Sequence, residues 1–221
     1  MFSLIQKYRS ELVTCALVGE LLASPIAEKN PHIGGCLALV VLVLLLTGSN
    51  YSVNKTRDRA VLISLTAVWT TMRLGEAFDG SHHIFSSLAP VSGLLLSCAV
   101  FRMILDRFGM IPEVTGSVIS EAFIGYLIIA IAFSQIYSIL NMFMESPFNQ
   151  VIPAWKTSTL LYFSMITLSS VGYGGIVPIN PYLRITAALE SMVGIFYVAV
   201  VVARLVSSYR PKIRRVSGNE A

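Results

Sequence analysis

Long apolar stretches are the feature that most constrains what this chain of 221 residues can fold into. The clearest contains an unbroken apolar run from Cys36 to Leu46. A helix that crosses a bilayer needs about 20 mostly apolar residues. Six stretches come near or reach this length: residues 12–27, 33–50, 60–77, 86–105, 118–142 and 184–206. The sequence therefore predicts an all-α membrane protein with six transmembrane helices.

Composition argues against a soluble enzyme or a nucleic-acid-binding protein. Hydrophobic residues make up 55% of the chain and charged residues 13%, whereas soluble domains carry about 25% charged residues. Cys15, Cys36 and Cys98 lie inside apolar stretches without C-x-x-C spacing, which is typical of buried small side chains. We expect no enzymatic activity, no cofactor, no disulfide and no nucleic-acid partner.

The basic residues favour a multi-pass topology with both termini in the cytoplasm, because Lys and Arg gather in cytoplasmic loops. With six spans, the cytoplasmic set is Lys7, Arg9, Lys55, Arg57, Arg59, Arg102, Arg107, Arg204, Arg210, Lys212, Arg214 and Arg215. The outer set is smaller and consists of Lys29, Arg73, Lys156 and Arg184. We therefore expect a protein of the plasma (cell inner) membrane that is surrounded by lipid.

A seventh apolar stretch, residues 154–168, is too short to cross a bilayer. About fifteen residues at 1.5 Å each reach roughly 22 Å. Pro153 suits the start of a helix, and Gly172, Gly174 and Gly175 follow the stretch. Irregular backbone at membrane depth occurs only where it is buried in protein or lines water. The pattern predicts a re-entrant helix followed by a loop that lines a pore.

The loop residues Ser170-Val171-Gly172-Tyr173-Gly174 closely resemble the T-V-G-Y-G selectivity filter of potassium channels. The resemblance implies that K⁺ loses its water and binds backbone carbonyls at Ser170, Val171, Gly172 and Tyr173. It also implies that the side chains of Val171 and Tyr173 point away from the ion path. Alternating glycines would let successive carbonyls point the same way, because glycine tolerates unusual backbone angles.

The resemblance extends over roughly residues 118–207. Pro178, Arg184 and Gly194 stand where the family often has a proline, a basic residue and an inner-helix glycine. Gly175 and Ile166 replace acidic residues that brace the filter in some members. The resemblance therefore implies a preserved filter whose conductance and inactivation differ from those of relatives that have both acids.

The predicted organisation has three parts. Residues 1–110 would form a four-helix peripheral transmembrane domain, and residues 210–221 a short basic cytoplasmic tail. Residues 111–209 would form the pore domain, with outer helix, pore helix, filter and inner helix. One chain supplies one pore loop and a filter of this type needs four, so the resemblance implies a homotetramer.

The resemblance implies a potassium-selective channel subunit that conducts K⁺ passively. Two alternatives stay open. Ser170 and Gly175 leave room for a nonselective cation channel of the same fold. A subunit of a potassium transporter is the second alternative, although transporters with filter-like loops carry four in one chain.

Charged residues inside the predicted spans are candidate sensors or braces, because intramembrane charges are costly and usually functional. The fourth stretch carries Arg102 alone, so voltage dependence should be shallow. Glu20 lies in the first stretch and Glu190 in the inner helix. For Glu190 we expect a structural role, with hydrogen bonds to the pore helix or its neighbours.

Gly194 is the candidate gating residue, since glycine within a helix costs about 1 kcal/mol relative to alanine and needs a local reason. It could let the inner helix bend and open a cytoplasmic mouth near Val201, Val202 and Leu205. It could instead let the pore helix and the filter base pack closely. The sequence does not choose between these two interpretations, and it does not identify the stimulus that opens the pore.

Overall fold

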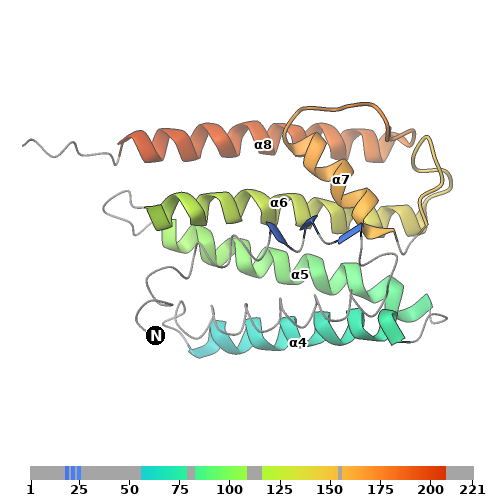
Figure 1. The fold of residues 1–221 in the computed structure, drawn as a ribbon, viewed down its shortest axis with the longest axis horizontal. Coiled ribbons are helices and arrows are strands. Elements are labelled where there is room, and N and C mark those ends of the chain that lie inside the picture. The colour runs from blue at the N-terminus through green and yellow to red at the C-terminus, as the bar shows by residue number, and fades with distance from the viewer. Residues whose placement is uncertain are drawn as a thin grey trace, which may run out of the picture.

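The computed structural model describes residues 56–78, 83–108, 116–153 and 156–207, with short pieces at 18–19, 21–22 and 24–25. These residues form an all-helical structure, shown in Figure 1. Its helices are α4 (Thr56–Phe78), α5 (His83–Phe108), α6 (Gly116–Phe143), α7 (Thr157–Leu168) and α8 (Pro181–Ser207). The predicted spans 12–27 and 33–50 fall on residues that lie almost entirely outside the described part.

The prediction of six transmembrane helices plus a pore helix is wrong. Among the described residues, three helices are long and apolar enough to cross a membrane: Leu88–Asp106, Val118–Phe143 and Pro181–Arg204. The predicted span 60–77 corresponds to a shorter apolar segment, Ala60–Gly75. Helix α4 carries charged residues near both ends, Arg57, Asp58 and Arg59 at its start and Arg73 and Glu76 near its end, so the uncharged stretch between Arg59 and Arg73 is shorter than a span needs.

The four long helices lie side by side in the order α4, α5, α6, α8, and successive helices run in opposite directions (Figure 1). Gly93 on α5 is a point of close approach between three of them. A Cβ atom at Gly93 would lie 3.1 Å from both Trp69 Nε1 on α4 and Gln135 Nε2 on α6. The missing side chain therefore lets polar groups of α4 and α6 approach α5.

Buried hydroxyl groups in these helices are satisfied within the helix that carries them. Thr66 and Thr70 donate to carbonyls one turn earlier in α4, at 2.7 Å and 2.8 Å, and Ser97 does the same in α5 at 2.8 Å. A hydroxyl bonded in this way exposes little polarity to its surroundings. This arrangement suits helices in an apolar environment, where an unpaired polar group is costly.

The short helix α7 is re-entrant. It begins at the end of the molecule where α6 ends, runs obliquely between α6 and α8, and stops part of the way along them (Figure 1). Residues 169–180 then return to the end at which it entered, where α8 begins. α7 starts at Thr157, four residues after Pro153, so Pro153 lies in the preceding loop, where its carbonyl accepts from the Lys156 amide at 2.9 Å.

Candidate functional site: a loop held at the end of a re-entrant helix

The backbone of the filter segment, residues 170–174, alternates in handedness. Ser170, Gly172 and Gly174 have φ values of +59°, +53° and +81°, whereas Val171 and Tyr173 do not have positive φ. A positive φ is uncommon outside glycine, which makes Ser170 the strained position of the three. Residues of alternating handedness cancel one another's twist, so such a segment stays extended and its carbonyls can face one side.

The amides at the start of this segment are bonded to the last carbonyls of α7. The Ser170 amide donates to Thr167 O at 2.9 Å, and the amides of Val171 and Gly172 donate to Ile166 O at 2.9 Å and 3.1 Å. The last carbonyls of a helix lack intrahelical partners. The filter segment supplies those partners, which couples its position directly to the position of α7.

The outer part of the filter segment is uncovered within one chain. Val171 is 51% exposed and Tyr173 is 76% exposed. Cβ atoms built at Gly172, Gly174 and Gly175 meet no atom within 4 Å. These glycines are therefore not explained by close packing in this chain; at Gly172 and Gly174 the positive φ is the local reason for glycine.

Asn149, in the loop before α7, holds the chain that leaves the filter. Its backbone amide donates to Val177 O at 2.8 Å, and its side-chain Oδ1 accepts from the backbone amide of Val177 at 2.9 Å. Its Nδ2 donates to Gly175 O at 3.3 Å. The neighbouring residue Phe148 forms an isolated antiparallel bridge with Pro178. Asn149 thus clamps the post-filter segment, residues 175–179, from the outside.

We expect Asn149→Ala to destabilise the filter, because it removes two side-chain hydrogen bonds worth together about 1–2 kcal/mol. Single-channel recording should show shorter openings, and thermal unfolding should shift to lower temperature. Asn180→Ala is the matched control, since Asn180 Oδ1 instead accepts from the Tyr182 amide at the start of α8, at 2.9 Å. If the control shortens openings as much as Asn149→Ala does, the clamp has no specific effect on the filter.

A hydrogen-bonded group of side chains lies behind α7. Glu190 on α8, Tyr137 on α6 and Ser164 on α7 are all fully buried. The Tyr137 hydroxyl donates to Glu190 Oε2 at 2.6 Å, and Ser164 Oγ bonds Glu190 Oε1. Ser164 Oγ also lies 2.7 Å from Ala130 O on α6. One buried carboxyl group therefore joins α6, α7 and α8.

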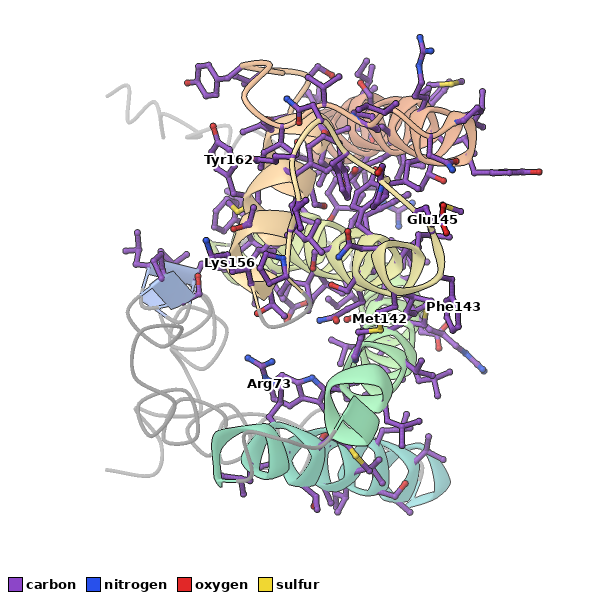
Figure 2. The ribbon with its side chains drawn as sticks, turned by 90° about the vertical axis from the view of Figure 1, so that its right-hand side faces the viewer. Arg73, Met142, Phe143, Glu145, Lys156 and Tyr162 are labelled. Atoms are coloured by element: carbon purple, nitrogen blue, oxygen red, sulfur yellow. The ribbon has the colours of Figure 1, made fainter. Side chains whose placement is uncertain are left out.

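An aromatic cluster extends this contact toward the loop before α7. Tyr137 and Phe163 meet edge to face with ring centroids 4.9 Å apart, and Phe148 meets Phe163 at 5.3 Å. Tyr162, the neighbour of Phe163, is 45% exposed and projects from α7 away from α6 and α8 (Figure 2). The two adjacent aromatic residues of α7 therefore face opposite environments, one the core and one the outside of the chain.

Gly194 on α8 lies against the last residue of α7. A Cβ atom at Gly194 would overlap the carbonyl oxygen of Leu168 and lie 2.9 Å from its carbonyl carbon. Leu168 is 1% exposed. This contact favours the interpretation that Gly194 allows close packing at the filter base.

Two further contacts connect α8 to its surroundings. Ser191 Oγ lies 2.9 Å from Ser170 Oγ, which ties the inner end of the filter segment to α8. One turn and a half further along, the Tyr197 hydroxyl donates to Ala122 O on α6 at 2.7 Å. α8 is thus bound at its middle to the filter and to the first half of α6.

The remaining predicted site residues are scattered. Arg102 is exposed on α5, Val202 is exposed near the end of α8, and Val201 beside it is half-buried. The side chain of Leu205 and the whole of Glu20 lie outside the described part of the chain. The structure therefore brings Ser170, Gly194 and Glu190 to one place around α7, and it does not bring Arg102 there.

Sequence reasoning missed Asn149, Tyr137, Ser164 and Ser191 as parts of this site. A signal exists for three of them, since Ser164, Tyr137 and Ser191 stand within apolar stretches where a polar atom needs a partner. Asn149 carries no comparable signal, because an asparagine in a loop is ordinary.

Residues 125–210 match a protein family described as "Ion channel". No curated protein matches the chain. The matched segment holds most of the candidate span in α6 and all of the candidate span in α8, with α7 and the filter segment between them. The match therefore supports an ion channel function for a membrane protein, and it is centred on a unit of two spans, in agreement with the correction to the predicted fold.

Proposed function

We propose that this protein is a subunit of a potassium-selective channel. The observation that carries the proposal is the filter segment Ser170–Gly174, which alternates in handedness at the end of a re-entrant helix. Such a backbone can offer a row of carbonyl oxygens to a dehydrated cation. K⁺ is then the permeant ligand at Ser170, Val171, Gly172 and Tyr173, with no cofactor and no covalent chemistry.

A homotetramer follows from this proposal. A ring of carbonyls around an ion needs several copies of the loop, and filters of this kind use four. The exposed filter segment supports the assembly, as does α8, whose apolar span is only 11% buried within one chain. The exposed apolar side chains of α8 include Ile185, Leu189, Met192, Phe196 and Val200. Contacts with neighbouring copies and with lipid would cover them.

The distribution of basic residues supports a cell membrane location with the filter facing outward. The ends of α5 and α8 and the start of α4 lie at the end of the molecule opposite the loop residues 175–180 (Figure 1). The basic residues in these three helix ends are Arg57, Arg59, Arg102, Arg107 and Arg204. Because Lys and Arg are enriched on the cytoplasmic side of membrane proteins, we infer that the end of α8 lies in the cytoplasm. With Arg102 the only basic residue of the span Leu88–Asp106, voltage dependence is shallow.

The proposal is tested by the reversal potential of the purified protein in planar bilayers with K⁺ on one side and Na⁺ on the other. We expect a reversal potential far from zero, with the sign that opposes the flow of K⁺ out of its compartment, because the carbonyl oxygens replace the water of K⁺ better than that of Na⁺. Tyr173→Asp should weaken this preference. Tyr182→Asp is the matched control, since Tyr182 is 73% exposed and lies outside the filter segment.

Equal permeability to Na⁺ and K⁺ in the unmutated protein would show a nonselective cation channel instead. A monomer or dimer that carries out saturable transport without unitary currents would show a transporter subunit. The number of subunits, measured by mass photometry or native mass spectrometry in detergent, separates that case from a tetrameric channel.

A further inference from the structure

If Glu190 is ionised, its two oxygens and Ala130 O are three acceptors, but the hydroxyl groups of Tyr137 and Ser164 have only two hydrogens to donate. Ser164 Oγ lies within bonding distance of both Ala130 O and Glu190 Oε1. A serine hydroxyl has one hydrogen, and a backbone carbonyl can only accept. Both contacts are hydrogen bonds only if Glu190 itself supplies a proton to Ser164.

The second oxygen of Glu190, Oε2, already accepts a hydrogen bond. The Tyr137 hydroxyl donates its single hydrogen to Glu190 Oε2 at 2.6 Å. With a proton on Oε1, the group becomes a chain in one direction: Tyr137 to Glu190, Glu190 to Ser164, and Ser164 to Ala130 O. Each of the three hydrogens is donated once, and the acceptors are Glu190 Oε2, Ser164 Oγ and Ala130 O.

The surroundings of Glu190 also disfavour a charge. Its side chain is 0% exposed, on a candidate membrane span. The partners of its oxygens are the two hydroxyl groups of Tyr137 and Ser164, and no basic side chain of the described residues is among the groups that act on its charge. An ionised carboxylate without a cation is very costly to bury, whereas a neutral acid that donates and accepts is not.

We propose that Glu190 is a neutral carboxylic acid that positions the pore helix. Its O–H donates to Ser164, and the resulting chain of hydrogen bonds fixes α7 against α6 and α8. Ser164 lies two residues before Ile166, whose carbonyl accepts from the amides of Val171 and Gly172. Glu190 therefore acts on the filter through α7. The effect on conduction rests on the proposed channel function, but the protonation state does not.

The protonation state is tested by infrared spectroscopy of the full-length protein in lipid bilayers at neutral pH. We expect a carbonyl stretch of a protonated carboxylic acid that disappears in Glu190→Gln. Ser164→Ala should keep this band and move it to higher frequency, because the acid loses its acceptor. Glu145→Gln is the matched control, because Glu145 is exposed beyond the end of α6 (Figure 2). This variant should leave the protonated-acid band unchanged and reduce only the carboxylate bands.

The proposal is overturned if Glu190→Gln removes carboxylate bands and leaves no difference in the protonated-acid region. The infrared result does not depend on whether the protein conducts K⁺. A failure of this proposal can therefore be distinguished from a failure of the proposed channel function.

A second arm tests the positioning role by replacement. Glutamine can donate from its amide group to Ser164 and accept from Tyr137, so Glu190→Gln should keep channel open probability within about twofold of wild type. Glu190→Ala and Ser164→Ala leave buried partners unpaired, and each should lower open probability about tenfold. If glutamine is as damaging as alanine, a charge is required at this position and the neutral acid is excluded.

Discussion

Gly172→Ala is expected to abolish potassium-selective current, although the added methyl group has open space around it. A Cβ at Gly172 meets no atom of the chain within 4 Å, so steric overlap within the subunit is not the reason. The reason is the backbone, because Gly172 has φ of +53°. An L-residue in this region costs roughly 1–2 kcal/mol, and the proposed assembly would carry the cost four times around one ion path.

Gly175→Ala provides the matched control for this prediction. Gly175 also has open space around a built Cβ, but its φ is not positive. We expect its alanine variant to keep selective current at near wild-type levels. Both variants should be compared by K⁺ flux into liposomes and by bi-ionic reversal potential. If the two alanines are equally harmful, backbone handedness does not explain why Gly172 is glycine.

The second large effect is expected for Gly194→Ala, which should destabilise the unit formed by α6, α7 and α8. The new Cβ would overlap the Leu168 carbonyl at the end of α7. Overpacking of a well-packed site costs about 1–3 kcal/mol and sometimes more. Because the backbone of α7 continues directly into the filter segment, relief of the overlap must move the filter. We expect a lower unfolding temperature, a smaller yield of assembled protein, and loss of conduction in what remains.

Leu168→Ala distinguishes the cause of this effect. The closest overlap is with the backbone carbonyl, and the Leu168 Cδ1 lies farther from the built Cβ, at 3.1 Å. Trimming the leucine side chain should therefore not rescue Gly194→Ala. If Gly194→Ala instead assembles normally, retains K⁺/Na⁺ selectivity and changes only the open probability, Gly194 acts as the hinge of α8 and the packing interpretation fails.

The peripheral helices show where counting apolar residues fails. The predicted stretches 86–105, 118–142 and 184–206 correspond closely to candidate spans of the structure. The stretch 60–77 does not, because charges interrupt α4 at both ends and the uncharged stretch between Arg59 and Arg73 is shorter than a span. The positions of charged residues along a helix therefore distinguish a membrane span from a packed helix better than the mean composition of the stretch does.

The filter segment is the part of the candidate site whose backbone the sequence alone predicts. Its pattern of glycines, Gly172 and Gly174, is a local property of the backbone, since positive φ at alternate residues requires little beyond the residue itself. The short apolar stretch before it also predicts a helix that enters and stops, and α7 does so. The sequence also assigns Ser170 to this segment, but it does not predict the positive φ of Ser170 or the bond between its hydroxyl group and that of Ser191.

The hydrogen bonds that hold the filter segment and α7 in place were decided by tertiary structure. Tyr137 and Glu190 are 53 residues apart, Ser164 and Ala130 are 34 apart, and Asn149 lies 28 residues before Val177. No local pattern specifies such pairs, because each depends on how α6, α7 and α8 cross. The amino-acid sequence alone determined that the chain is apolar enough for a membrane and that one loop is built for alternating backbone handedness. The packing of three helices determined that Glu190 is buried behind α7 and that Gly194 meets its last carbonyl, since a side chain acquires partners only where distant segments come together.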